Sequence, residues 1–296
     1  MMTRIGSLVL LLGLASGLIF AARQSAGPVN AEWARTHDAA LRKIMRLRSD
    51  ARLDFRTARV DPSNPNYYLA EFDAVQGVTR YQLEEFRVSR DAQRVAFKER
   101  DGSYRLEYDL ADPFRAFRDQ IQLAGAPSRG PAEAPLTVVE YLDYTCGYCH
   151  LFYQTEEKAM LQRYGANVRL VIKHLPILSS ASAQAAYAAV CAHQQSEDKF
   201  WALHDKFFEN GNQVKQGRAG ILALAGQVGL NATAMGRCMD DPATHEIVSR
   251  DLQEAQKLGL EATPGFFVNG TPLTGYLRPE SFFAFLDEEL RAAQSR

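Results

Sequence analysis

The stretch Leu-Thr-Val-Val-Glu-Tyr-Leu at residues 136–142, followed by Asp-Tyr-Thr-Cys-Gly-Tyr-Cys-His at residues 143–150, decides the fold of this chain. Its first part is a nearly continuous apolar and β-branched run, which is typical of a strand buried on both faces. Two cysteines separated by two residues come next, directly before an apolar pattern with helical spacing. The order predicts a buried strand that leads into a helix with Cys146 at its first turn.

This placement gives the two cysteines different chemistry. Unsatisfied backbone N–H groups and the helix dipole favour negative charge at the start of a helix, so the pKa of the Cys146 thiol is expected to be low. Cys149 follows one helical turn later and is placed to attack a mixed disulfide on Cys146 and release the partner. Gly147 and Tyr148 between them are expected to tune how oxidising the pair is.

A Cys-x-x-Cys motif also marks zinc sites, so a metal site is the alternative reading. The other two cysteines, Cys191 and Cys238, belong to no second motif of this kind. The histidines stand at no familiar ligand spacing from the motif. The pattern therefore favours a redox pair, and we expect neither a metal nor another cofactor.

The segments after the motif complete a recognisable order of elements. They read as a helix, a buried strand, an Ala-rich helical segment, a short strand with a turn and a terminal amphipathic helix, at residues 151–164, 168–175, 179–258, 266–270 and 279–294. This order resembles a thioredoxin-like α/β fold with a helical insertion. In that fold a cis-proline just before the third strand lies against the active disulfide. Thr263-Pro264 occupies this place, and we expect a cis bond there with Thr263 beside the sulfur, although trans is the default for about 95% of X-Pro bonds.

Three segments, at residues 139–149, 199–208 and 262–270, resemble the DsbA-like thioredoxin-superfamily thiol–disulfide oxidoreductases. The resemblance covers residues 136–296. The string Thr-Cys-Gly-Tyr-Cys-His also resembles disulfide isomerases of the DsbC kind, whereas the helical insertion resembles DsbA. The resemblance implies an exported enzyme that forms, isomerises or reduces disulfides in envelope proteins.

The resemblance also implies roles for four further residues. Glu140 and Lys173 match an acidic–basic pair beneath the disulfide that assists proton movement, and a buried carboxylate can take the proton of Cys149. The alternative is that the two residues only form an ion pair, as buried charges require. Cys191 and Cys238 match a subgroup in which a structural disulfide joins two insertion helices, with two free buried thiols as the alternative.

The first half of the chain carries no such chemistry. Residues 28–123 contain no cysteine and predict a small α+β module for oligomerisation or partner binding. We expect a helix at residues 28–47 and strands at residues 67–72, 79–88, 94–99 and 104–108. Residues 124–135 are rich in Gly and Pro and are expected to be a linker. Residues 1–27 hold an uncharged apolar run at residues 5–22, which predicts an apolar helix that is either a signal peptide or a membrane anchor. Either reading exports the rest of the chain.

The balance of charged residues argues against one class of function, nucleic-acid binding. The 34 Lys and Arg against 35 Asp and Glu leave a formal charge of −1, so no global field recruits nucleic acid. We expect a periplasmic oxidoreductase, soluble after signal cleavage or tethered to the inner membrane by residues 5–22. Its expected partners are exported protein substrates, a membrane redox partner that re-oxidises or reduces the pair, and a second copy bound through residues 28–123. The alternative is a redox-capable chaperone or assembly factor that mainly binds partner proteins.

Overall fold

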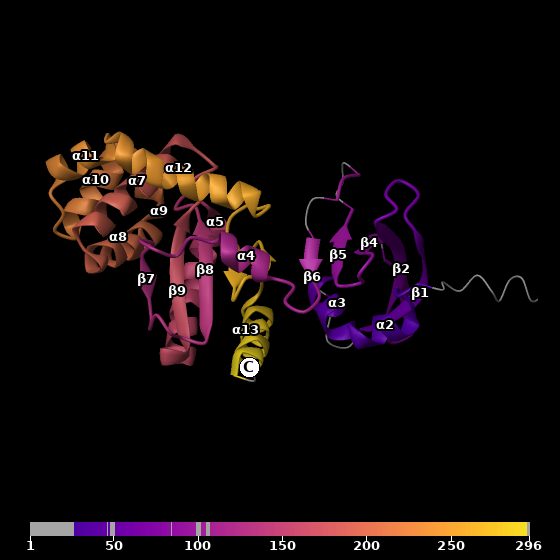
Figure 1. Ribbon diagram of the computed structural model, residues 1–296. Helices are drawn as coiled ribbons and strands as arrows, with labels where there is room; N and C mark the ends of the chain where they lie inside the picture. The colour runs from indigo at the N-terminus through magenta and orange to yellow at the C-terminus, as the bar shows by residue number, and fades with distance from the viewer. Residues whose placement is uncertain are drawn as a thin grey trace, which may run out of the picture. The chain divides into compact units, whose positions relative to one another are not determined.

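The computed structural model describes residues 27–45, 47, 51–83, 85–98, 102–104 and 107–294. The chain divides into two compact units, one ending at Arg115 and one beginning at Ala116 (Figure 1). The predicted apolar helix at residues 5–22 lies outside the described residues. Within the described ranges, no helix combines the length and the apolar character needed to cross a membrane.

The first unit is an antiparallel sheet with two short helices. Among its described residues, six strands are ordered β1-β2-β4-β5-β6, and β3 pairs with β2. The strands are β1 (Arg52–Val60), β2 (Tyr67–Gln76), β3 (Thr79–Gln82), β4 (Phe86–Ser89), β5 (Arg94–Phe97) and β6 (Glu107–Asp109), and the helices are α2 (Ala31–Thr36) and α3 (Asp38–Ile44). Trp33, Leu41, Phe72 and Phe86 are buried together in its core, where the rings of Phe72 and Phe86 stack at 5.1 Å.

Local sequence explains how this unit begins. The Asn30 side chain accepts the backbone N–H groups of Glu32 and Trp33, which starts α2, and the Trp33 indole N–H donates to the carbonyl of Ala92 at 2.8 Å. The single helix expected from the pattern is divided at His37 into α2 and α3. The pattern also predicted one strand where β3 and β4 are separate, and it missed β1.

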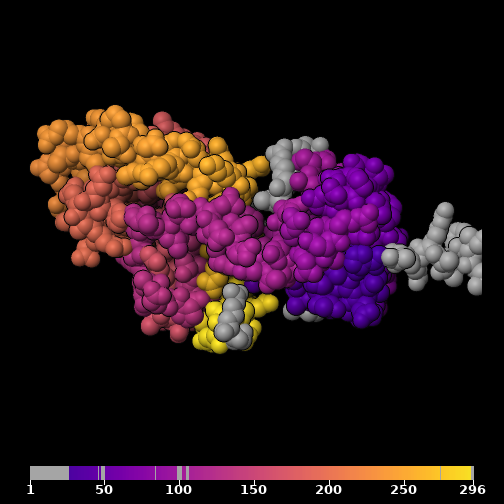
Figure 2. All heavy atoms as spheres, viewed as in Figure 1, coloured from indigo at the N-terminus to yellow at the C-terminus, as the bar shows by residue number. Residues whose placement is uncertain are grey.

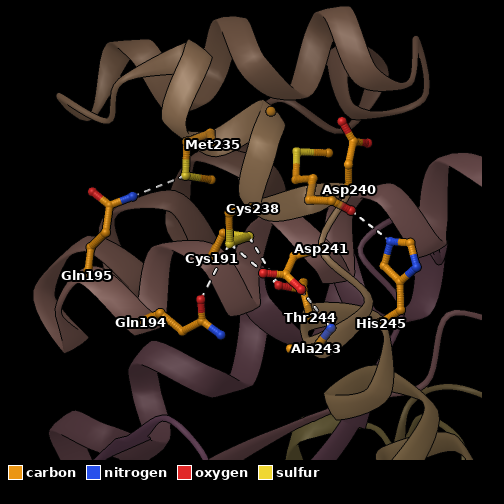
Figure 3. The surroundings of a disulfide bond; sticks show 12 residues. Cys191, Gln194, Gln195, Met235, Cys238, Asp240, Asp241, Ala243, Thr244 and His245 are labelled. Atoms are coloured by element: carbon orange, nitrogen blue, oxygen red, sulfur yellow. Dashed lines mark hydrogen bonds between the residues drawn. A yellow bond between two sulfur atoms is a disulfide. The ribbon is translucent and has the colours of Figure 1, made fainter.

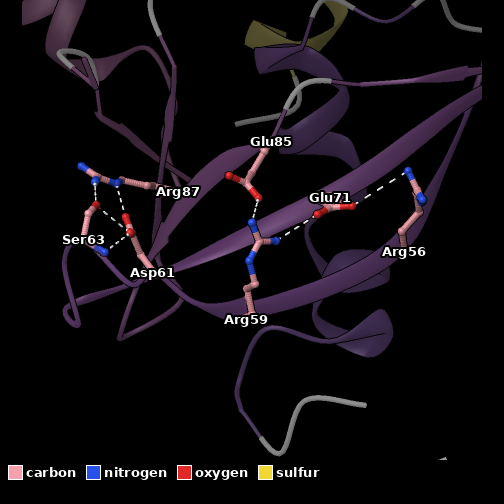
Figure 4. A network of polar contacts seen from close by, with 7 residues as sticks. All are labelled: Arg56, Arg59, Asp61, Ser63, Glu71, Glu85 and Arg87. Carbon is pink, nitrogen blue, oxygen red and sulfur yellow. Dashed lines mark hydrogen bonds and ion pairs between the residues drawn. The ribbon is translucent and has the colours of Figure 1, made fainter. Parts of the chain in front are cut away.

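Charged side chains pair across one face of this sheet (Figure 4). The Arg59 guanidinium contacts the carboxylates of both Glu71 and Glu85, while Arg87 donates to Asp61 at 2.6 Å. Arg59 is half exposed, so this network stays in contact with water. Asp61 is buried but is paired with Arg87, so the network supports the sheet without leaving a buried charge unpaired.

The second unit is built on a mixed sheet of five strands in its described residues, in the order β11-β10-β8-β9-β7. The strands β8 and β9 are parallel at the centre, and the others are antiparallel to their neighbours. The bounds are β7 (Ser128–Arg129), β8 (Leu136–Leu142), β9 (Val168–His174), β10 (Gly265–Val268) and β11 (Thr271–Thr274). This architecture agrees with the α/β fold with a helical insertion that the sequence predicted for this half.

Helices cover both faces of this sheet. They are α4 (Arg115–Gln120), α5 (Gly147–Phe152), a π-helical turn η1 (Tyr153–Glu157), α6 (Lys158–Tyr164), a 3-10 turn η2 (Gly165–Asn167), α7 (Ser180–Gln195), α8 (Glu197–Glu209), α9 (Gly211–Val214), α10 (Arg218–Gln227), α11 (Ala232–Met239), α12 (Pro242–Lys257) and α13 (Pro279–Gln294). In Figure 2 the segment from α7 to α12 forms one closely packed body of atoms. The aromatic rings of Phe152, Phe266 and Phe282 join α5, β10 and α13 on one face.

The division between the units lies earlier than the sequence indicated. The pattern ended the first module at residue 123 and made residues 124–135 a linker. The structure instead packs Phe117 of α4 against Phe267 of β10 at 5.4 Å, and β7 pairs with β9. Because Phe117 packs on β10, and because the Ile172 amide donates to the carbonyl of Pro127 at 3.0 Å, this segment belongs to the second unit.

A disulfide closes the helical segment. Cys191 of α7 and Cys238 of α11 are bonded across a sequence separation of 47 residues (Figure 3). This is the pairing that the resemblance implied. The Thr244 hydroxyl lies 3.5 Å from the Cys238 sulfur and links the bond to α12.

Candidate active site

A tight turn follows strand β8 and ends at Cys146. The Asp143 carboxylate accepts the backbone N–H of Thr145 at 2.8 Å, and its second oxygen accepts the amides of Ile177 and Leu178 at 3.1 Å. An aspartate that binds the amide two residues later makes an Asx turn. Cys146 therefore lies at the N-cap of α5, as the sequence predicted, with extended backbone angles. Asp143 fixes this geometry, and its role was missed from the sequence alone.

The Cys146 thiol is surrounded by groups that stabilise its charged form. The Thr263 side chain is one of these groups, while the Thr263 carbonyl oxygen, 3.3 Å from Sγ, can only accept the S–H of the protonated thiol. Hydrogen bonding from the Cys149 thiol is the main cause that lowers the pKa of Cys146 to about 5, and Thr263 and the amides of Cys149 and Tyr148 act in the same direction. A thiolate is therefore the predominant form at neutral pH.

The second cysteine is in the opposite state. Cys149 is completely buried on the inner side of α5. Burial raises its pKa well above the ordinary value, and the charge of Cys146 and Glu140 raises it further. One thiol is thus poised to react, and the other stays protonated until the first has reacted.

The Thr263–Pro264 peptide bond is cis, as the sequence led us to expect. Thr263 is buried beside Cys146, and β10 begins at the next residue after the proline. Gly265 pairs with Tyr141 of β8, which holds this loop against the start of α5.

Glu140 and Lys173 do not form the pair that the sequence suggested. In the parallel register Glu140 lies opposite Ile172 and Tyr141 lies opposite Lys173, so the two charged side chains point to opposite faces of the sheet. The Lys173 ammonium binds Asp251 at 2.6 Å and Glu254 at 3.1 Å, both on α12. The expectation of a Glu140–Lys173 pair is therefore wrong, because side chains on neighbouring parallel strands alternate between the faces.

Glu140 itself remains next to the redox pair. It is buried, and neither carboxyl oxygen has a hydrogen-bond partner among the described residues. Burial, followed by the charges of Glu157 and Cys146, raises its pKa well above the ordinary value. A buried carboxyl with no partner on either oxygen calls for an explanation, and proton transfer with the thiols is the hypothesis that the resemblance supplied.

The surface near Cys146 includes exposed aromatic and apolar side chains as well as a polar cavity. The Tyr148 ring is exposed and stacks on Tyr276 at 6.0 Å, and the side chains of Ile177 and Leu178 are also exposed. A cavity of about 590 Å³ adjoins Cys146 on its other side and is lined mainly by polar residues. These include His150, Glu209, Asn210, Asn212, Gln213 and Lys215.

One cluster has the composition of a metal site. Among the described residues, Glu157, His204 and Asp205 bring three possible ligand atoms within 4.8 Å of one another. The Arg129 guanidinium lies 3.3 Å from Asp205 and 3.9 Å from Glu157 and supplies positive charge there. A cation would be repelled by this guanidinium, so the cluster fits a buried ion-pair network better than a metal centre.

A family model described as Thioredoxin matches residues 123–288. The chain belongs to the thioredoxin family. It is 31% identical over 169 residues to the Na(+)/H(+) antiporter NhaA of Herminiimonas arsenicoxydans, a match that covers 57% of this chain and 26% of that protein. It is 25% identical over 185 residues to disulfide bond formation protein D of Bacillus subtilis, covering 60% and 82%. The chain spans about a quarter of the length of the first curated relatives it matches.

Solved structures show the same fold. BdbD from Bacillus subtilis superimposes with a TM-score of 0.52 at 22% identity, covering 57% of this chain and 95% of that one. Alpha-DsbA1 from Wolbachia pipientis gives a TM-score of 0.53 at 20% identity, covering 60% and 98%. The predicted resemblance to DsbA-like proteins is confirmed at the level of family and fold.

Proposed function

We propose that this chain is a thiol–disulfide oxidoreductase that exchanges disulfides with protein substrates through Cys146 and Cys149. The asymmetry of the two thiols carries the proposal. Cys146 has a pKa of about 5 and adjoins a cavity, whereas Cys149 is buried with a raised pKa. A relative named disulfide bond formation protein D supports the same class of activity.

The geometry accommodates both half-reactions. In the oxidising direction, a substrate thiolate attacks Sγ of Cys146 in the Cys146–Cys149 disulfide, and Cys149 leaves as a thiolate that takes up a proton. A second substrate thiolate then attacks the substrate sulfur of this mixed disulfide and expels Cys146 as a stable thiolate. The substrate gains a disulfide, and the pair is left as one thiolate and one thiol. Isomerisation and reduction use the same steps in other orders.

The direction of exchange follows from the charge on Cys146. A low pKa stabilises the reduced pair, because the thiolate is lost when the disulfide forms. We therefore propose that the pair is oxidising, with a reduction potential nearer the ~−120 mV of DsbA than the ~−270 mV of thioredoxin. The backbone of Thr263, beside the sulfur, is proposed to pair with an extended substrate segment.

We propose that the protein works outside the cytoplasm, in the periplasm. Two features support this: the apolar run at residues 5–22, and a Cys191–Cys238 disulfide, since such bonds persist in oxidising compartments. A membrane redox partner that resets the pair, and self-association through residues 28–123, complete the proposal.

The proposal is tested by incubating the full chain with reduced and with scrambled ribonuclease in a glutathione buffer. Recovery of ribonuclease activity from the reduced form, with a lower rate from the scrambled form, is expected of an oxidase. The Cys149→Ser variant should accumulate a mixed disulfide with the substrate. If neither form regains activity faster than in buffer and no mixed disulfide forms, the proposed function is wrong. Light scattering of the same sample gives the oligomeric state.

A further inference from the structure

The polar cavity of about 590 Å³ beside the reactive thiol lies between two segments that are far apart in the sequence. One wall is the start of α5, where Thr145, Cys146, Gly147 and His150 line the cavity. The other wall comes from residues 209–216, where α8 ends and α9 follows. A substrate chain bonded to the Cys146 sulfur therefore has this cavity beside it.

The second wall carries groups that both donate and accept hydrogen bonds. The side chains of Asn212, Gln213 and Gln216 line the cavity, and each side-chain amide offers an oxygen acceptor and an NH₂ donor. These groups match the N–H and C=O groups of a peptide. An apolar side chain placed against them would leave buried polar groups unpaired, which costs free energy. The cavity is thus suited to a hydrophilic peptide segment.

The charges that line the cavity favour a negatively charged ligand. Lys215 is exposed and forms no ion pair with any residue that the structure describes. The Glu209 carboxylate lies 3.7 Å from the ammonium of Lys206, so a cation already partly balances its charge. Cys146 carries no charge while it is bonded to Cys149, so an acidic segment that approaches the oxidised pair is not repelled by the sulfur.

Gly211 brings α9 close to α5 at one end of the cavity. A Cβ atom at this position would lie 3.7 Å from Nδ1 of His150, which is an ordinary van der Waals distance, and the backbone of Gly211 does not have a positive φ. The backbone therefore tolerates a side chain here, but a large one would occupy space between the two walls. Position 211 allows the cavity to be filled without a change in the redox motif.

We propose that this cavity is a specificity site for protein substrates, which receives a hydrophilic, acidic peptide segment next to the substrate cysteine and places a carboxylate near Lys215. The inference rests on the proposed function and names its substrate class. In the step concerned, the substrate thiolate attacks Sγ of Cys146 and forms a bond to it. The Cys146–Cys149 bond breaks, and Cys149 leaves as a thiolate that takes up a proton. The cavity binds the substrate alongside this step, so it lowers the concentration at which the rate is half-maximal.

The test uses the oxidised full-length protein and three reduced peptides that differ only in the residues beside their single cysteine, which are Glu and Asn, Lys and Asn, or Leu and Val. Acid quenching and alkylation give the rate at which each peptide reduces the Cys146–Cys149 disulfide. Each rate is divided by the rate with dithiothreitol for the same protein, and by the reactivity of the peptide toward glutathione disulfide. The acidic peptide should react about threefold faster than the basic peptide.

Charge reversal gives the sharper readout. In Lys215→Glu the preference should invert, so that the basic peptide reacts about threefold faster than the acidic one through a lower half-saturating concentration. Lys257→Glu is the matched control, because Lys257 is an exposed lysine on α12 that does not line the cavity. This control should keep the preference for the acidic peptide.

Filling the cavity tests its shape. Gly211→Leu should slow the acidic peptide about tenfold and the apolar peptide less. Gly226→Leu on α10 is the matched control, because a Cβ there meets no atom within 4 Å and Gly226 does not line the cavity. If Gly211→Leu does not fold, the charge reversal decides.

Three results would overturn the inference: equal rates for the acidic and basic peptides in the unmodified protein, an unchanged preference in Lys215→Glu, or equal slowing in both leucine variants. Each of these leaves the proposed function standing, because the peptides still reduce the disulfide. A protein that neither dithiothreitol nor any peptide reduces would disprove the proposed function, and the inference with it.

Discussion

The two units treat ionisable side chains in opposite ways. In the first unit, Arg59 is half exposed and contacts both Glu71 and Glu85 across neighbouring strands. In the second unit, Glu140 is buried and finds no hydrogen-bond partner among the described residues. Exposed charges that pair cost little and contribute little, whereas a buried carboxyl without a partner costs free energy of folding.

This difference in the treatment of ionisable side chains indicates which unit carries the chemistry. Departures from local rules are expected at functional or strained sites, and Glu140 lies on the same face of β8 as Val138 and Leu142, which share a core with Cys146 and Cys149. Among the described residues of the first unit, no buried side chain is left without a hydrogen-bond partner in this way. The predictions below vary one side of this contrast at a time.

The largest effect is expected from the reactive thiol. Cys146→Ser removes the thiolate that exchange requires, so the rate of ribonuclease oxidation should fall to that of buffer alone. The fold should be retained, since serine is similar in size, and circular dichroism checks this. Residual catalysis above one-hundredth of the original rate would mean that another group acts as the nucleophile.

The second largest effect concerns stability of the helical segment. Replacing Cys191 and Cys238 together with alanine opens a loop of 47 residues, and the chain-entropy model predicts a loss of about 4 kcal/mol in the free energy of unfolding. Urea unfolding followed by tryptophan fluorescence measures this loss. Exchange by Cys146 should persist at low temperature, whereas loss of exchange in a folded variant would give the second disulfide a part in the chemistry.

Replacing the buried acid should raise the free energy of unfolding, which is the opposite of the effect expected for loss of the disulfide. Glu140→Leu removes an unpartnered carboxyl from the core, so we expect the protein to become more stable by about 1–3 kcal/mol while resolution of mixed disulfides slows. Urea unfolding and the rate of resolution check the two parts. A variant that is less stable than the original would show that Glu140 is structurally satisfied.

The smallest effect is expected on the charged face of the first unit. Arg59→Ala breaks two exposed ion pairs and should lower the free energy of unfolding by less than about 1 kcal/mol, and less again at high salt. Exchange activity should not change. A loss of several kcal/mol would contradict the view that this network is peripheral to stability.

The sequence correctly predicted several features that depend on local pattern. The continuous apolar run predicted β8, and the strand–motif–helix order predicted Cys146 at the start of α5. The cis Thr263–Pro264 bond beside Cys146 was expected from the resemblance to the thioredoxin-like fold, because Thr263 lies 117 residues from Cys146 in the chain. The first two features depend on residues close together in the chain. The turn at Asn269 and Gly270 was predicted for the same reason, and both residues have positive φ.

Local sequence pattern did not predict the tertiary contacts. Lys173 pairs with Asp251 rather than with Glu140, because strand register decides which face each side chain occupies. The position of β7 depends on pairing with β9, and no local signal in a Gly- and Pro-rich segment reveals it. The inward turn of Glu157 depends on a π-helical turn that side-chain periodicity does not encode.

The most direct test of the central claim is the pH titration of the Cys146 thiolate in the reduced protein, followed by its ultraviolet absorbance. A midpoint near pH 5 is expected from the groups that surround the sulfur. Because the folded pKa lies below the unfolded value of 9.0, the thiolate stabilises the reduced protein fully above about pH 9, and this contribution is lost as pH falls through about 5. The reduced form should therefore gain stability over the oxidised form between these limits. A midpoint near 9, with no such gain, would contradict the account.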